Sequence, residues 1–188
     1  ALTFDPSYYG YSEGTPHYLS SPELYVEDFS AGIDFLGTRK FVDREKLGVI
    51  GICGSGGFAL SAAQIDPRIK AVVTASMYDI SRYVRNGFGD SLTQEARAAM
   101  LKDLAEQRYQ DFVTGRPALD SRSWQIGALT DDDADAVSKE FAGFYVQPRG
   151  YHHNAIAQHT LSSNPAFMNF SLLDHVDEIS PRPILLIM

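Results

Sequence analysis

The sequence predicts an α/β fold built on a parallel sheet, and three observations carry this prediction. Short apolar runs at residues 47–50, 69–75 and 184–188 have the length and composition of buried strands. Segments with apolar residues at helical spacing lie between these runs. A glycine-rich turn joins the first run to the helix that follows it. Because strands that alternate with helices are joined by right-handed crossovers, we expect the strands to lie parallel in one sheet.

The composition limits the classes of protein to consider. The chain has 188 residues, of which 44% are hydrophobic, enough for one domain with a proper core. A net charge of -8 and a pI near 5.0 argue against nucleic acid as a partner, because proteins that bind it carry basic patches. A single cysteine permits no internal disulfide, which favours a reducing, cytoplasmic setting. No apolar run approaches the ~18 residues of a membrane helix, so no membrane partner is expected.

The first part of the chain is expected to hold a strand, a loop and a helix. Residues 2–5 predict a short strand, and a loop rich in glycine and tyrosine follows it. Residues 22–36 predict a helix, with Ser21 as its N-cap and Pro22 at its first position. The chain begins in this strand-like sequence and stops within the apolar run 184–188. Since central strands of a parallel sheet need neighbours on both sides, we expect a segment of a longer polypeptide, incomplete at both ends.

The second apolar stretch is organised as strand, tight turn and helix. The run 47–50 is continuously apolar, as in a strand that is buried on both faces. The turn holds the only cysteine, Cys53, and the glycines beside it permit positive φ angles and close approach of the helix. Residues 58–65 continue as a helix, which ends at Asp66 before a proline. This order is typical of a nucleophile elbow, which presents one side chain above the end of a sheet.

The motif Gly51-Ile52-Cys53-Gly54-Ser55-Gly56-Gly57 resembles the elbow of the α/β-hydrolase superfamily. Its cysteine version, Gly-x-Cys-x-Gly-Gly, is similar to that of the dienelactone hydrolases. The spacing of Gly10, Ser12 and Gly14 resembles the loop after the fourth strand of the same superfamily, although the arginine of that loop is absent. The resemblance implies an α/β-hydrolase core segment, strands 4 to 7 of the family sheet, formed by residues 1–79 and 181–188.

The elbow allows two registers, because Ser55 stands where these enzymes usually have glycine. Either Cys53 is the nucleophile, or Ser55 is. The apolar run stops at Ile50, and the nucleophile of this family follows the strand by about three residues, which favours Cys53. In that register the resemblance implies that the N–H of Gly54 forms half of the oxyanion hole. The N-terminus of the helix would stabilise the Cys53 thiolate.

The catalytic acid and base are less evident. Asp79 follows the strand 69–75 and lies in the right region to orient a base, although a helix cap or a loop hydrogen bond is the interpretation we favour. The family order is nucleophile, acid and histidine, with the histidine after the last strand. None of the five histidines has that place: His17, His152, His153, His159 and His175. The resemblance therefore implies that the histidine and the usual acid lie outside residues 1–188.

Residues 80–180 are expected to form a mostly helical insertion. Apolar positions predict helices at 93–112, 131–144 and 164–176, the second starting at an acidic triplet. An insertion at this point resembles the cap of α/β-hydrolases, which covers the active site. Aromatic residues that could line an acyl pocket, or simply form the core of the cap, are Tyr83, Phe88, Tyr109, Phe112, Trp124, Phe144, Tyr145, Tyr151, Phe167 and Phe170.

The resulting hypothesis is a hydrolase that acts on an ester, lactone or thioester carbonyl through Cys53. One alternative is an inactive hydrolase-like binding protein in which Cys53 is a small buried residue. A second is a nucleotide-binding α/β domain, since a glycine-rich turn before a helix can hold phosphate. No cofactor or metal is expected, and the partner is a small-molecule acyl substrate. A homo-oligomer, or remaining segments of the same polypeptide, are further partners left open.

Overall fold

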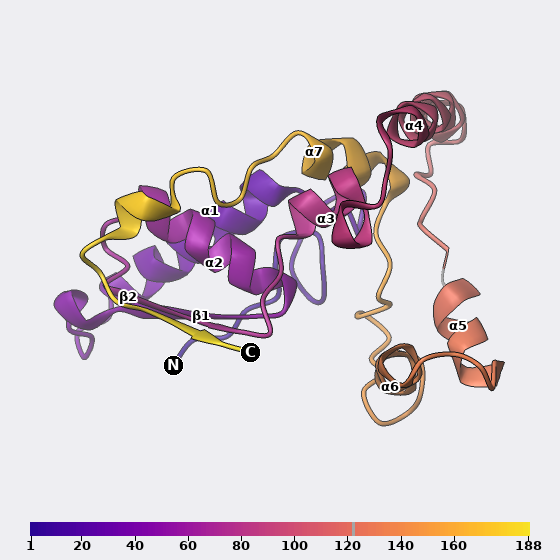
Figure 1. Ribbon diagram of the computed structural model, residues 1–188. Helices are drawn as coiled ribbons and strands as arrows, with labels where there is room; N and C mark the ends of the chain where they lie inside the picture. The colour runs from indigo at the N-terminus through magenta and orange to yellow at the C-terminus, as the bar shows by residue number, and fades with distance from the viewer. Residues whose placement is uncertain (122) are drawn as a thin grey trace.

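A three-stranded parallel sheet forms one layer of the molecule and lies along its lower edge in Figure 1. The computed structural model describes residues 1–121 and 123–188, and the side chains of these residues except 123–126. The strands are β1 (Gly48–Ile52), β2 (Ala71–Ala75) and β3 (Ile184–Ile187), in that spatial order. Both pairs are parallel, and Val49, Val72 and Ile184 stand side by side. The predicted parallel α/β sheet is therefore confirmed.

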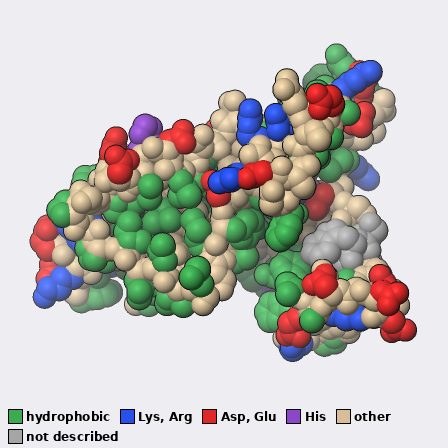
Figure 2. Space-filling view, viewed as in Figure 1, with side chains coloured by type: hydrophobic (Ala, Val, Ile, Leu, Met, Phe, Trp, Pro, Cys, Tyr) green, Lys and Arg blue, Asp and Glu red, His purple; other side chains and the backbone are tan. Residues whose placement is uncertain are grey.

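Helices α1 (Pro22–Gly37) and α2 (Gly54–Ile65) cover one face of this sheet. Side chains alternate between the faces of a strand, so Val49 and Val72 point to the same side and are buried there. The alternate positions Ile50 and Ile52 point to the other face, and they are 68% and 65% exposed. In Figure 2, hydrophobic side chains form a broad patch over the part of the molecule that holds the sheet and α2.

The predicted helix 22–36 is confirmed, and its start follows the expected chemistry. The Ser21 hydroxyl accepts a hydrogen bond from the N–H of Leu24 at 3.4 Å, and Pro22 occupies the first helical position. Val26 and Ile33 of this helix are buried in the core.

The prediction of a strand at residues 2–5 is wrong. This segment has no strand pairing within the described chain, and β1 and β3 are the outer strands of the sheet. Its apolar side chains pack on α1 instead, where the Phe4 and Phe29 rings meet edge to face at 5.8 Å. Leu2 and Phe4 also lie over Gly32 of the same helix.

Five helices follow β2 before the chain returns to the sheet. They are α3 (Ile80–Asn86), α4 (Gln94–Thr114), α5 (Ser123–Thr130), α6 (Ala136–Tyr145) and α7 (Asn164–Met168). Short 3-10 turns stand at Arg44–Lys46, Phe88–Asp90, Leu161–Ser163 and Val176–Ile179. The helix expected at 93–112 is confirmed as α4. Figure 1 shows α4, α5 and α6 beyond the end of the sheet where the strands terminate.

Two of the predicted helices have the wrong bounds. The helix expected from 131 begins only at Ala136, because the carboxylate of Asp135 caps it by accepting from the N–H groups of Val137 and Ser138 at 3.0 Å. The stretch expected to be helical over 164–176 ends at Met168, and a separate 3-10 turn follows at Val176–Ile179.

The last part of the insertion packs into the core of the sheet layer. Phe167, Leu172 and Ile179 are buried and belong to the same cluster as Phe58 of α2. The Phe58 and Phe167 rings lie 6.2 Å apart. The division of the chain into a core and a cap at residues 80 and 180 stays a prediction.

Candidate active site

The turn between β1 and α2 places Cys53 in an unusual backbone conformation. Cys53 has a φ of 58° and a ψ of -132°, and its N–H donates to the Ala75 carbonyl at 2.9 Å. Its side chain is exposed. A non-glycine residue in such a region costs on the order of 1–3 kcal/mol, and such residues cluster at active sites and ligand clamps. The turn therefore has the sharp, strained form of a nucleophile elbow.

Two glycines make this turn possible by leaving room for close packing. A Cβ at position 51 would lie 2.5 Å from the Gly56 Cα and 2.6 Å from the Ser55 carbonyl oxygen. A Cβ at position 56 would lie 2.6 Å from the Cβ of Met77. Since real Cβ atoms do not approach so closely, only glycine lets strand, helix and the segment after β2 meet here.

Ser55 is tied to the end of β1 by both of its hydrogen-bonding functions. Its hydroxyl donates to the Ile52 carbonyl at 2.7 Å and accepts from the Ile52 N–H at 2.8 Å. The hydroxyl thus closes the turn below Cys53. These two contacts distinguish Ser55 from the exposed Cys53 thiol, two residues earlier.

Two tyrosine phenols lie near the Cys53 thiol. Burial raises the pKa of Tyr78 to about 12, and the electrostatic influence of Cys53 adds to this rise. Burial also raises the pKa of Tyr145, with a further contribution from Cys53. Tyr78 follows β2, whereas Tyr145 ends α6, so the core and the insertion each supply one phenol.

The two tyrosines near Cys53 differ in whether the sequence predicted them as site residues. Tyr145 was among the aromatics expected to line a pocket. Tyr78 was not, although its place directly after a strand and beside Asp79 was the available signal. Tyr83, also expected, contacts the Tyr78 ring edge to face at 6.1 Å. Phe167 lies in the core instead, and the side chain of Trp124 lies outside the described residues.

Asp79 caps α3 in this structure. Its carboxylate accepts a hydrogen bond from the N–H of Arg82 at 2.9 Å. This is the helix-cap arrangement that the sequence analysis favoured. Its role as the acid of a catalytic set stays a prediction.

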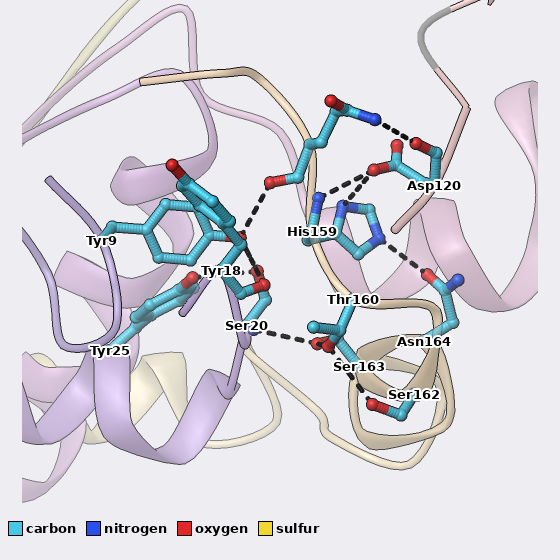
Figure 3. A network of polar contacts seen from close by, with 11 residues as sticks. Tyr9, Tyr18, Ser20, Tyr25, Asp120, His159, Thr160, Ser162, Ser163 and Asn164 are labelled. Carbon is cyan, nitrogen blue, oxygen red and sulfur yellow. Dashed lines mark hydrogen bonds and ion pairs between the residues drawn. The ribbon is translucent and has the colours of Figure 1, made fainter. Parts of the chain in front are cut away.

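The histidines of the described chain make their contacts away from Cys53. His159 Nε2 lies 3.1 Å from Asn164 Oδ1, and Nδ1 lies 3.8 Å from Asp120 Oδ1 (Figure 3). His152 and His153 stack on each other at 4.4 Å beside Tyr11. His17 contacts the Tyr18 ring, and His175 lies 3.6 Å from Glu178. No histidine hydrogen bond, ion pair or ring contact in the described residues reaches Cys53.

Metal-binding clusters and membrane-spanning helices are both absent from the described residues. No group of three or more His, Cys, Asp or Glu side chains among these residues is arranged to hold a metal ion. None of the helices in the described part has both the length and the apolar character needed to cross a membrane.

Comparison with solved structures identifies the fold. The crystal structure of the alpha/beta hydrolase GrgF from Penicillium sp. sh18 superposes with a TM-score of 0.73 at 16% identity, over 97% of this chain and 58% of that chain. The chain has an α/β-hydrolase fold. No protein-family model matches the chain.

Two relatives of higher identity are uncharacterized proteins. The uncharacterized protein PA2218 of Pseudomonas aeruginosa is 44% identical over 99% of this chain and 50% of its own length. Its crystal structure superposes with a TM-score of 0.88. The uncharacterized protein YcjY of Escherichia coli is 31% identical over 86% of this chain and 52% of its own. The chain therefore spans about half the length of these curated relatives.

A relative with a named activity matches a shorter region. The thiohydrolase aneE of Aspergillus aculeatus is 37% identical over 73 residues, which is 39% of this chain and 23% of that protein.

Proposed function

We propose that this chain carries the nucleophile of a hydrolase, of dienelactone-hydrolase type, that cleaves an ester, lactone or thioester through Cys53. The observation that carries the proposal is the exposed Cys53 thiol at positive φ, at the apex of the elbow of an α/β-hydrolase fold. The thiohydrolase among the relatives supports acyl chemistry for this fold.

In the proposed reaction the Cys53 thiolate attacks the carbonyl carbon of the substrate. The C–S bond forms as the π electron pair of the carbonyl moves onto its oxygen. Gly54 is the first residue of α2, so its N–H has no partner within the helix and can donate to this oxyanion. The C–O or C–S bond to the leaving group then breaks, and water hydrolyses the acyl-cysteine. A base, histidine in this family, would take the thiol proton.

The hydrogen bonds of Ser55 support the choice of Cys53. A serine nucleophile needs its proton directed to a base, whereas the Ser55 hydroxyl donates to the Ile52 carbonyl. Ser55 suits a role in holding the turn. The alternative of a non-catalytic binding protein assumed a buried Cys53, and the exposure of the thiol removes that support.

The test compares Cys53→Ala with Ser55→Ala in the full-length protein, using a p-nitrophenyl ester and the matching acyl thioester. We expect Cys53→Ala to lose turnover by at least about 10³-fold, and Ser55→Ala to keep most of it. Mass spectrometry of the quenched wild type should find the acyl group on the peptide that contains Cys53. Thermal unfolding of both variants serves as the control for folding.

Two results would count against the proposal. Unchanged turnover in Cys53→Ala together with loss in Ser55→Ala would show that Ser55 is the nucleophile. Full turnover in both variants would show that this elbow is not catalytic.

A further inference from the structure

The Tyr78 hydroxyl lies against the first residue of α2. A Cβ at position 54 would be 3.7 Å from Tyr78 Oη and 3.9 Å from Tyr78 Cε1. The phenol therefore lies beside the same Gly54 backbone whose N–H is free to donate at the start of the helix. Cys53 directly precedes Gly54 in the chain, and its charge contributes to the raised pKa of Tyr78.

The Tyr78 hydroxyl is open to a bound substrate. Among the described residues it makes no hydrogen bond to the protein, and Tyr78 is 41% exposed. Burial raises the pKa of Tyr78 to about 12, so the group keeps its proton throughout the neutral range. It is thus a protonated, partly exposed donor that can bond to a bound substrate.

The phenol is positioned by rigid elements. Ser76, at the end of β2, has a φ of 48°, and its N–H donates to the Ile187 carbonyl at 2.8 Å. This turn directs the chain across the start of α2, where the Tyr78 carbonyl oxygen would lie 3.5 Å from a Cβ at position 57. The Tyr83 ring of α3 then meets the Tyr78 ring edge to face at 6.1 Å.

We propose that Tyr78 is a catalytic residue that donates a hydrogen bond to the carbonyl oxygen of the acyl group attacked by Cys53, beside the N–H of Gly54. This inference rests on the proposed function of Cys53. As the bond between Cys53 Sγ and the carbonyl carbon forms, the π electron pair moves to the oxygen. The phenol stabilises the resulting oxyanion and keeps its proton, so no further proton acceptor is required.

Tyr78→Phe in the full-length protein tests the assignment, since it removes the hydroxyl and keeps the ring. We expect kcat for the p-nitrophenyl ester to fall by about 10²-fold with KM nearly unchanged, because the hydrogen bond strengthens only as charge develops. The matched control is Tyr11→Phe, which removes the hydroxyl of a tyrosine that is 75% exposed in the loop before α1 and should keep wild-type turnover. Thermal unfolding confirms that each variant is folded.

Tyr78 could stabilise either the carbonyl oxygen of the substrate or the Cys53 thiolate. The rate at which iodoacetamide alkylates Cys53 distinguishes these two roles, because alkylation involves the thiolate and no carbonyl. We expect this rate to be the same in Tyr78→Phe and in the wild type. A slowing of alkylation equal to the loss of turnover would overturn the assignment, because Tyr78 would then act on the thiolate. Loss of turnover in Tyr145→Phe but not in Tyr78→Phe would also overturn it.

Cys53→Ala separates the two proposals. If this variant is inactive while Tyr78→Phe equals the wild type, only the role of Tyr78 is wrong. If Cys53→Ala retains full turnover, the proposed function fails, and the role of Tyr78 fails with it.

Discussion

At the scale of single residues, three hydroxyl groups join the loop before α1 to the rest of the molecule. Tyr9 Oη lies 2.8 Å from Ser20 Oγ, and Tyr25 Oη donates to the same oxygen at 2.9 Å (Figure 3). The Ser20 N–H in turn donates to Ser163 Oγ at 2.9 Å, next to Thr160. Since Ser20 and Ser163 are 143 positions apart, this network connects the start of α1 with the end of the insertion.

Tyr25 should make the protein sensitive to alkali. Burial raises the pKa of Tyr25 above the ordinary 10.0, so the folded state holds its proton more tightly than the unfolded chain does. The stabilisation is complete below pH 10 and is lost as the pH rises further, by up to about 1.4 kcal/mol per pH unit for one group. Tyr25→Phe should reduce this slope and cost about 1 kcal/mol at pH 7 through the lost hydrogen bond.

Urea unfolding followed by circular dichroism between pH 7 and pH 11 measures this slope. The control is Tyr11→Phe, since Tyr11 is 75% exposed, and it should leave the slope as in the wild type. An unchanged slope in Tyr25→Phe would contradict the prediction.

The site residues differ in how far the sequence could predict them. The elbow could be predicted because its glycines lie together in the sequence at 51–57, although the contacts of the turn with Ala75 and Met77 are tertiary. The place of Tyr78 directly after a strand was a signal in the sequence, but its orientation depends on the turn at Ser76 and on packing against Tyr83. Its proximity to Gly54 is a tertiary contact that only the folded chain defines.

At the scale of elements, one arginine connects the end of α2 to the segment before β3. The Arg182 guanidinium donates to the carbonyls of Ala63 and Asp66 at 2.6 and 3.1 Å, and to that of Ile69 at 2.9 Å. A helix end leaves its last carbonyls without partners in the helix. Arg182 supplies partners there and fixes the approach of β3 to the sheet.

Arg182→Met should therefore destabilise the fold by about 3 kcal/mol, because several part-buried carbonyls lose a charged donor at once. The matched control is Arg149→Met. Arg149 forms an exposed ion pair with Glu140, which is worth about 0–1 kcal/mol. Chemical denaturation of both variants measures the difference. Equal losses of unfolding free energy in the two variants would show that the Arg182 contacts do not stabilise α2.

The elements that the sequence predicted well are those whose pattern is local. Helices α1 and α4 follow from apolar periodicity, together with the expected cap at Ser21 for α1, and the structure adds Thr93 as the cap of α4. The errors at 131–144 and 164–176 arose because each apolar periodicity was taken as one helix. The first helix starts late because the Asp135 side chain caps it at residue 136. The second ends early because the chain changes direction after Met168.

At the scale of the whole molecule, the described residues cover the sheet on the face where α2 lies and leave the other face open. Ile50, Val73 and Leu185 stand side by side in the register, on the face opposite α2. Leu185 is 55% exposed, and β3 is exposed along its whole length. An apolar sheet face and unpaired strand edges of this kind favour association with other surfaces. The strands lie where the sequence predicted them. Their burial on both faces, which was also predicted, depends on which elements cover the sheet.

This open face should govern how residues 1–188 behave when produced alone. We expect them to elute in size-exclusion chromatography above the 20.8 kDa of one chain and to bind an apolar dye. The double substitution Ile50→Lys with Leu185→Lys places two charges on the open face and should reduce both effects, since charge there opposes association. Phe112→Lys is the control: Phe112 is an equally apolar, exposed residue on α4, away from the sheet, and its substitution should change neither. A monodisperse 20.8 kDa species without dye binding would contradict the prediction.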